Sequence, residues 1–241
     1  MALFTDGPVS TIEELAGHDS QLLNVATVEG IDVTTKLELA QEELGIELET
    51  LLERRLLDKV VVTPPLRLWH AYRSLEMVYQ DAYSNQLNDR YANKRDEFRD
   101  LARWAMDRLI RLGVGLVHHP VPKAAEPCVT LTPGLLPDGT YYATVSWVNA
   151  AGEEGDCADV VSVVTASSTF VVNPRRAPGV AVGWNVYAGA APEQVVLQNT
   201  VPNPVGATWV QPEPLVTDGK RPGQGQGPNT LYRIARRISR G

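Results

Sequence analysis

The sequence predicts an α+β chain of two domains: an N-terminal all-α helical bundle, then an antiparallel β-sandwich, then an extended C-terminal arm. Three observations lead to this fold class. Apolar residues recur at helical spacing up to about residue 115, short runs rich in Val, Tyr, Trp and Thr follow from about residue 125, and basic residues gather at the end. The length of 241 residues suits two domains of about 100 residues each.

Two short helices are expected first. Ser10–Glu13 and Thr11–Glu14 each have the spacing of a capping box, in which two side chains cap the first turn of a helix. The sequence therefore predicts a short helix that begins there and stops near Gly17. A second short helix is expected over Asp19–Glu29, ended by Gly30.

A long helix is expected next, with Asp32 as its N-cap and its end near Leu57. Its acidic residues lie opposite an apolar stripe, which consists of Leu37, Ala40, Leu44, Leu48, Leu51 and Leu52. The run Thr63-Pro-Pro65 prevents any continuation, because proline lacks the amide hydrogen that a helix needs.

The stretch Leu66–Leu112 carries the strongest helical pattern in the chain, and the rest of the helical domain is expected to pack against it. It is longer than a usual globular helix, and Ser84–Asn88 is its weakest part, so we expect two helices or one bent helix. The predicted helical core comprises Leu68, Tyr72, Leu75, Tyr79, Phe98, Leu101, Ala105 and Leu109. Gly113-Val-Gly115 ends the helices, which gives a helical domain over residues 1–120.

Residues 121–215 are expected to form the β-sandwich. Seven short runs are separated by Pro and Gly turns, as is typical of antiparallel sheets. The predicted strands are Val129–Thr132, Tyr141–Asn149, Val160–Thr165, Thr169–Val172, Trp184–Ala188, Val195–Asn199 and Thr208–Val210. Alternation along the second of them predicts that Tyr141, Val145 and Trp147 face the core.

Charge is distributed unevenly. Residues 1–120 hold 20 acidic and 13 basic side chains, residues 121–215 hold 8 and 3, and residues 216–241 hold 1 and 6. Residues 219–227 are flexible by composition, and Leu231–Arg240 alternates apolar and basic residues, as a short helix or an extended strand would. Such a tail is a solvated end, a nucleic-acid contact or an arm that docks on a protein. Its interleaved apolar residues favour protein docking, because binding to phosphates alone does not need them.

The sequence carries no recognisable motif for catalysis or cofactor binding, so we expect no enzymatic activity and no cofactor. There is no P-loop, no H-E-x-x-H and no C-x-x-C. Cys128 and Cys157 suit a reducing cytosol, and we expect no signal peptide, membrane span or metal site. The acidic group Glu153, Glu154, Asp156 and Asp159 leaves calcium open as an alternative to an ordinary loop.

These residues resemble a known family. The segments STIEELAGHDSQLLNVATVEGIDVTTKLELAQEEL, LWHAYRSLEMVYQDAYSNQLNDRYANKRDEF and LARWAMDRLIRLGVGL resemble the head–tail connector (adaptor) proteins of tailed bacteriophages, over roughly residues 1–120. The segments GTYYATVSWVNAAGEEG and GWNVYAGA look like the fibronectin-III or Ig-like modules often appended to virion proteins. The Tyr-rich strand lies earlier here than in the fibronectin pattern, so a sandwich is expected without strict fibronectin topology.

The resemblance implies a structural virion protein at the neck, beneath the portal vertex, that is present in the host cytoplasm during assembly. Its implied partners are the portal protein, a tail or neck protein below the ring, further copies in a homo-oligomer of roughly twelve subunits, and genomic DNA that passes through the lumen without sequence recognition. No membrane is involved. The arm expected to dock on the portal comprises Leu231, Tyr232, Arg233, Ile234, Arg236, Arg237, Ile238 and Arg240.

A function of another class is left open by the sequence. The chain would then be a virion accessory or receptor-binding protein, and the β-sandwich would recognise a receptor or a carbohydrate at the cell surface. Exposed aromatic residues on one face of the sandwich would favour that alternative.

Overall fold

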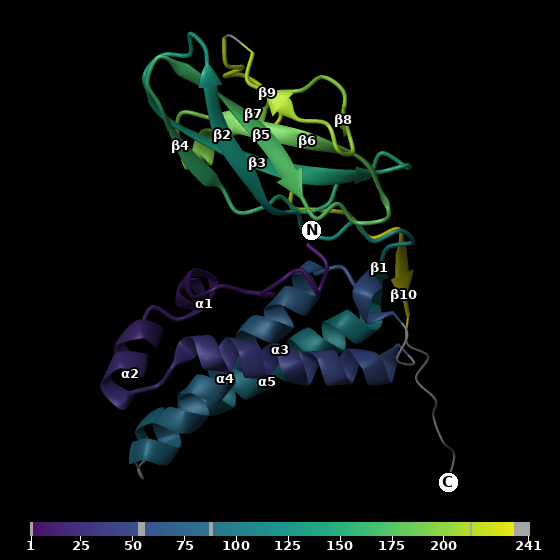
Figure 1. The fold of residues 1–241 in the computed structure, drawn as a ribbon. Helices are drawn as coiled ribbons and strands as arrows, with labels where there is room; N and C mark the ends of the chain where they lie inside the picture. The colour runs from purple at the N-terminus through teal and green to yellow at the C-terminus, as the bar shows by residue number, and fades with distance from the viewer. Residues whose placement is uncertain (1, 53–55, 87–88, 213, 234–241) are drawn as a thin grey trace. The chain divides into compact units, whose positions relative to one another are not determined.

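The computed structural model describes residues 2–52, 56–86, 89–212 and 214–233, and its fold is α+β (Figure 1). The chain divides into two compact units. The helical unit comprises Gly7–Leu116 and the chain from Pro228 onward, and the β unit comprises the chain up to Asp6 and Val117–Gly227. These bounds differ from the predicted 1–120, 121–215 and 216–241, because the C-terminal tail is divided between the two units.

The first three helices begin and end where their caps place them. Helix α1 (Ile12–His18) uses the second of the two predicted capping boxes, with Thr11 and Glu14 exchanging side-chain-to-backbone hydrogen bonds. Helix α2 (Leu22–Glu29) ends at Gly30. The Asp32 carboxylate accepts hydrogen bonds from two amides of α3 (Val33–Leu51). Helix α3 ends six residues before the predicted Leu57, because Leu57–Lys59 instead forms a 3₁₀ turn that leads to the bridge between Val60 and Leu116.

The predicted long stretch is two helices. Helix α4 (Pro64–Gln86) begins at a proline, which the first turn tolerates because its amide needs no helical partner. A 3₁₀ turn over Asp89–Tyr91 precedes α5 (Ala92–Leu112). Helix α4 lies at the centre of the unit, where it packs against α5, α3, α2 and α1. The interruption falls within the predicted weak segment.

The residues of the predicted helical core are all at least half-buried in the structure. Leu75, Tyr79, Phe98, Ala105 and Leu109 are buried, whereas Leu68, Tyr72 and Leu101 are half-buried. Tyr79 stacks on Phe98 with ring centroids 5.6 Å apart, and its hydroxyl donates to the Asp19 carboxylate (2.6 Å). Burial beside this carboxylate raises the pKa of Tyr79 well above its usual value, so the phenol stays protonated.

The helical unit is not all-α as predicted. Two short strands, β1 (Val114–Leu116) and β10 (Thr230–Tyr232), pair antiparallel within it. Strand β1 follows α5 at once, because Gly113 ends the helix with a positive φ of 103°. The sequence between Gly113 and Val117 is too short to give a strand signal, and its partner lies more than a hundred residues away.

The β unit holds two antiparallel sheets. One has the order β2 (Ala125–Pro133), β5 (Ser168–Arg175), β9 (Trp209–Val210). The other has the order β4 (Val161–Thr165), β3 (Gly139–Asn149), β6 (Ala181–Gly189), β7 (Val196–Leu197), and β8 (Asn203–Pro204) also pairs with β6. Each of the seven predicted strands overlaps one of these, but β8 falls where a turn was predicted.

Both sheets contribute to one hydrophobic core. Trp147 on β3 and Trp184 on β6 face each other across the strand pair, and Phe170 on β5 and Trp209 on β9 belong to the same cluster. Val145 and Trp147 are buried in it, and Tyr141 packs against it, as the alternation along β3 predicted. The opposite face of β3 and β6 is buried as well, which the sequence reading did not predict.

Candidate functional site

The C-terminal segment is the candidate site that the sequence indicates most directly, and the structure describes it as far as Arg233. Strand β10 pairs with β1 in the register Val114–Tyr232, Gly115–Leu231 and Leu116–Thr230. The Asn229 amide donates to the Leu116 carbonyl (2.9 Å). The segment is therefore a strand where it is described, and the predicted alternative of a helix does not hold for residues 230–232.

Gly113, just before β1, and Gly115, within β1, let the C-terminal segment approach closely. A Cβ on Gly113 would lie 3.0 Å from the Tyr232 carbonyl oxygen, and one on Gly115 would lie 3.1 Å from Cβ of Pro228. The Val61 amide donates to the Gly115 carbonyl (2.9 Å) on the other edge of β1. Strand β1 thus lies between residues 60–61 and β10, and β10 is the outer strand.

The side chains of β10 point into solvent. Leu231 is 54% exposed and Tyr232 is 40% exposed. Two apolar side chains on an outer strand are the kind of surface that another chain can cover. Of the predicted docking arm, Leu231, Tyr232 and Arg233 are described, whereas Ile234, Arg236, Arg237, Ile238 and Arg240 lie outside the described residues.

The segment before the arm differs from its expected flexibility. Residues 216–227 pack on the β unit: Gln198 exchanges two hydrogen bonds with the Val216 backbone, the Leu197 amide donates to the Lys220 carbonyl (2.8 Å), and Asp156 bridges Gln224. Gln226 is buried, where it accepts from the Val121 amide (2.6 Å) and donates to the His119 carbonyl (3.0 Å). The Gly-rich composition predicted flexibility, but backbone hydrogen bonds do not depend on composition.

Glu154 is the centre of the buried polar face of the β unit. Its carboxylate accepts hydrogen bonds from the Ser146 and Tyr187 hydroxyls and from the Asn185 amide (3.1 Å), and it pairs with Lys220 (2.9 Å). Burial acts to raise the pKa of Glu154, but these donors outweigh it and hold the pKa below its usual value. Glu154 is therefore ionised near neutral pH, and it pairs with Lys220 in the segment 216–227.

The residues considered for metal binding or catalysis have structural partners. Burial raises the pKa of the Cys157 thiol to about 12, which leaves it unreactive near neutral pH. Asp159 pairs with Lys123 (2.7 Å), and buried His70 contacts the Leu37 carbonyl (3.1 Å). Cys128 and Cys157 are both free thiols. Among the described residues, no group of three or more His, Cys, Asp or Glu side chains is placed to hold a metal ion.

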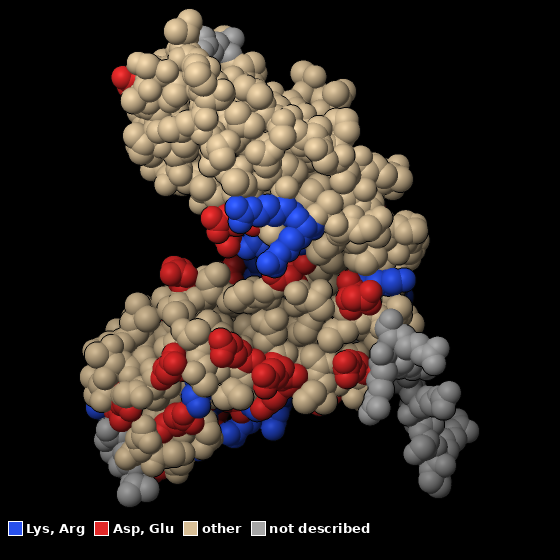
Figure 2. Space-filling view, viewed as in Figure 1, with Lys and Arg blue, Asp and Glu red and all other residues tan. Residues whose placement is uncertain are grey.

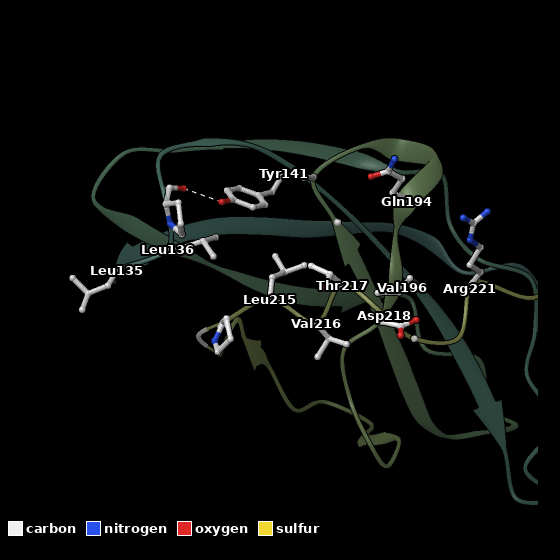
Figure 3. Close-up of a pocket in the computed structure, with 15 residues that line it drawn as sticks. Leu135, Leu136, Tyr141, Gln194, Val196, Leu215, Val216, Thr217, Asp218 and Arg221 are labelled. Carbon is white, nitrogen blue, oxygen red and sulfur yellow. Dashed lines mark hydrogen bonds between the residues drawn. The ribbon is translucent and has the colours of Figure 1, made fainter.

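A pocket of about 770 Å³ opens on the β unit, which the sequence did not indicate (Figure 3). Leu135, Leu136 and Tyr141 lie at one end, and Gln194, Asp218 and Arg221 lie at the other. The Tyr141 hydroxyl donates to the Pro137 carbonyl (3.0 Å), which fixes the ring. The pocket combines apolar walls with charged groups at one side, as ligand sites commonly do. Its residues come from three separate segments, 135–141, 189–196 and 214–221, so no local motif could reveal it.

No protein-family model matches the sequence, and no curated protein shows significant similarity to it. Within the described ranges, no helix is long and apolar enough to cross a membrane.

Proposed function

We propose that this chain is a structural adaptor of a tailed-bacteriophage neck, which forms a ring under the portal and joins the capsid to the tail. The observation that carries the proposal is the C-terminal segment. It is held on the helical unit as an outer strand with exposed apolar side chains, and a basic sequence follows it. The helical segments that resemble phage connectors support the same function.

In this proposal the arm anchors the adaptor to the portal. Leu231 and Tyr232 already face solvent on β10, so a portal surface covers them without unfolding the strand. The arginines beyond Tyr232 pair with acidic groups of the portal. Pairing of β10 with β1 orders the start of the arm in advance, which lowers the entropy lost on docking.

The remaining parts take the following roles. The chain is a two-domain protein in which the helical unit builds the ring and the β unit is a β-sandwich of Ig-like type. The acidic balance of residues 1–120 suits a channel through which DNA moves, because negative walls do not retain phosphates. The protein acts in the virion neck without catalysis, after assembly in the host cytoplasm.

Co-sedimentation with the portal ring encoded in the same genome tests the proposal. The full chain is expected to sediment with the ring. A chain ending at Gly227, which lacks β10, and a chain ending at Arg233, which keeps it, are both expected to bind at least about tenfold more weakly. If the chain ending at Arg233 binds like the full chain, then β10 is the anchor and the later residues are not. Absence of binding by the full chain would overturn the proposal.

The pocket of the β unit favours a second candidate function, recognition of a receptor or carbohydrate. Arg221, Asp218 and Gln194 offer hydrogen bonds for hydroxyl groups beside apolar walls. A glycan array probed with the full chain tests this candidate. Arg221→Ala is expected to abolish any signal from the pocket, whereas Arg175→Ala, an exposed arginine away from it, is expected to leave the signal intact.

A further inference from the structure

One face of α3 exposes apolar and acidic side chains together. Leu39 and Ile46 are both exposed, Ile46 by 66%. They lie seven residues apart, so they share a face of the helix, and Glu42 and Glu49 flank Ile46 at spacings of four and three. Acidic side chains gather along α3 in the view of Figure 2. We name Leu39, Glu42, Ile46 and Glu49 the acidic face.

The charges of α3 are poorly balanced within the unit. The helix holds five glutamates and one lysine. Lys36 pairs with Asp81, and Glu43 pairs with Arg73 (2.7 Å), but the other glutamates of α3 form no salt bridge with a described residue. Glutamates four residues apart on one helix repel each other. A cationic surface laid on this face would relieve that repulsion.

The C-terminal half of α5 presents the complementary surface. Trp104 is 46% exposed, and the Arg108 guanidinium lies over its ring, 5.4 Å from the centroid. Trp104, Arg108 and Arg111 are spaced by four and three residues, so they share one face of α5. Exposed Leu112 borders this face on one side and exposed Asp107 on the other. We name Trp104, Arg108, Arg111 and Leu112 the basic face. Tryptophan and arginine are the residues that most often dominate binding energy at interfaces.

A groove lies beside the acidic face. It has a volume of about 290 Å³ and is lined by Ile46 and Glu47 of α3, Trp69 and Arg73 of α4 and Met106 of α5, and Arg73 is already paired with Glu43. Met106 turns toward this groove, and Trp104, two residues earlier, lies about 200° around the helix and faces away from it. The acidic and basic faces therefore occupy different sides of the same unit.

We propose that the acidic face of one copy of this chain binds the basic face of a second copy, with Trp104 inserted in the groove beside Ile46. Arg108 enters with the indole and meets Glu47 at the rim, while Arg111 meets the glutamates of the acidic face. Because the two faces differ, the contact is heterologous, and repetition of it makes a ring when the rotation closes. Closure into a ring rests on the proposed function; the pairing of the faces does not.

Charge reversal on each face tests the pairing. Variant A carries Glu47→Lys and Glu49→Lys, and variant B carries Arg108→Glu and Arg111→Glu. Sedimentation analysis at low salt is expected to show self-association of the natural chain and association weakened at least about tenfold in A alone and in B alone. A mixture of A and B is expected to restore association, because each altered face then meets a face of opposite charge. The chain that combines all four changes is expected to associate as well.

Control variants separate this contact from other effects. Glu126→Lys with Glu193→Lys changes the net charge as variant A does, at exposed positions of the β unit, and is expected to leave association unchanged. Trp104→Ala is expected to weaken association at least about tenfold without loss of helical circular dichroism.

A natural chain that stays monomeric at about 100 μM and low salt would overturn the proposal, given that interfaces of this kind bind far below that concentration. So would a mixture of A and B that fails to associate. Binding to the portal is measured in a separate experiment. A chain that does not bind the portal would overturn the proposed neck function but would not change the interpretation of self-association.

Discussion

Glu154 shows at the residue scale how a buried charge stabilises the fold. The acidic run that includes it predicted a loop or a calcium site, and the structure places the carboxylate under four protein donors. The sequence could indicate the acidity of the loop. It could not indicate most of the donors, because Asn185, Tyr187 and Lys220 lie 31, 33 and 66 residues away in sequence.

The pKa of Glu154 predicts an acid-dependent loss of stability. The folded pKa lies below the ordinary 4.5, so the contribution to stability is complete above about pH 4.5 and is lost as pH falls through the folded pKa. Glu154→Gln is expected to lower the free energy of unfolding by about 1–3 kcal/mol at neutral pH. Urea unfolding across the acidic range is expected to show this difference shrinking below about pH 4.5. A difference that stays constant with pH would contradict the assignment.

Asp6 and Asp156, in the same unit, change the stability with pH in the direction opposite to Glu154. Burial raises the pKa of both carboxyl groups, so protonation favours the folded state as pH falls. The comparison between the natural chain and Glu154→Gln cancels their contribution, because both proteins contain them. The pH dependence of the difference therefore reports Glu154 alone.

Gly113 combines two features that favour glycine next to the β1–β10 pair. A side chain there would meet the Tyr232 carbonyl at 3.0 Å, and the φ of 103° is unfavourable for other residues. Gly113→Ala is expected to lower the free energy of unfolding of the helical unit by about 1–3 kcal/mol. Chemical unfolding, monitored by the circular dichroism of the helices, measures this loss of stability.

Gly30→Ala is the matched control for Gly113. Gly30 ends α2 with a positive φ of 66°, and a Cβ there would meet nothing within 4 Å. Alanine at this position is expected to lower the free energy of unfolding by about 1 kcal/mol, which is the cost of a positive φ without a close contact. Equal losses in both variants would mean that close approach of β10 is not what Gly113 provides.

Among the elements, the helices followed from the sequence more closely than the tail did. Asp32, Gly30 and Gly113 mark helix ends that the structure has, because caps act on neighbouring backbone. The break between α4 and α5 followed from weak propensity around Ser84–Asn88. The structure of the tail could not be predicted from the sequence, because β10 and residues 216–227 are held by hydrogen bonds to segments far away in sequence.

Gln226 provides a test of the tail element. Its buried side chain accepts from the Val121 amide and donates to the His119 carbonyl, so Gln226→Ala leaves the amide unpaired and removes one of the two donors to the carbonyl. The change is expected to lower the free energy of unfolding of the β unit by about 1–3 kcal/mol and to increase hydrogen exchange at residues 216–227. Gln224→Ala, at an exposed side chain two residues earlier, is expected to change neither quantity. Rapid exchange throughout 216–227 in the natural chain would show that the segment is not packed.

At the scale of the whole molecule, acidic and basic side chains are distributed unevenly along the chain. The first 120 residues carry an excess of acids, and the last 26 carry an excess of bases. The sequence revealed this separation completely, since it needs no coordinates. The assignment of acidic and basic faces to opposite sides of one unit needed the packing of α3 and α5 around α4.

The pairing of those faces predicts that self-association depends on salt. Exposed charges are screened over about 10 Å at 0.1 M salt and over about 3 Å at 1 M. Association measured by sedimentation is therefore expected to weaken at least about tenfold between these concentrations. Association that strengthens with salt would indicate a contact dominated by apolar burial instead.

The measurement that tests the neck function most directly is assembly without this chain. Phage particles made with its gene disrupted are expected to accumulate as filled heads separate from tails, and purified chain added to them is expected to restore joined, infectious particles. The chain ending at Gly227 is expected not to restore them. Complete particles that fail only in attachment to cells would contradict the adaptor function and support recognition by the β unit.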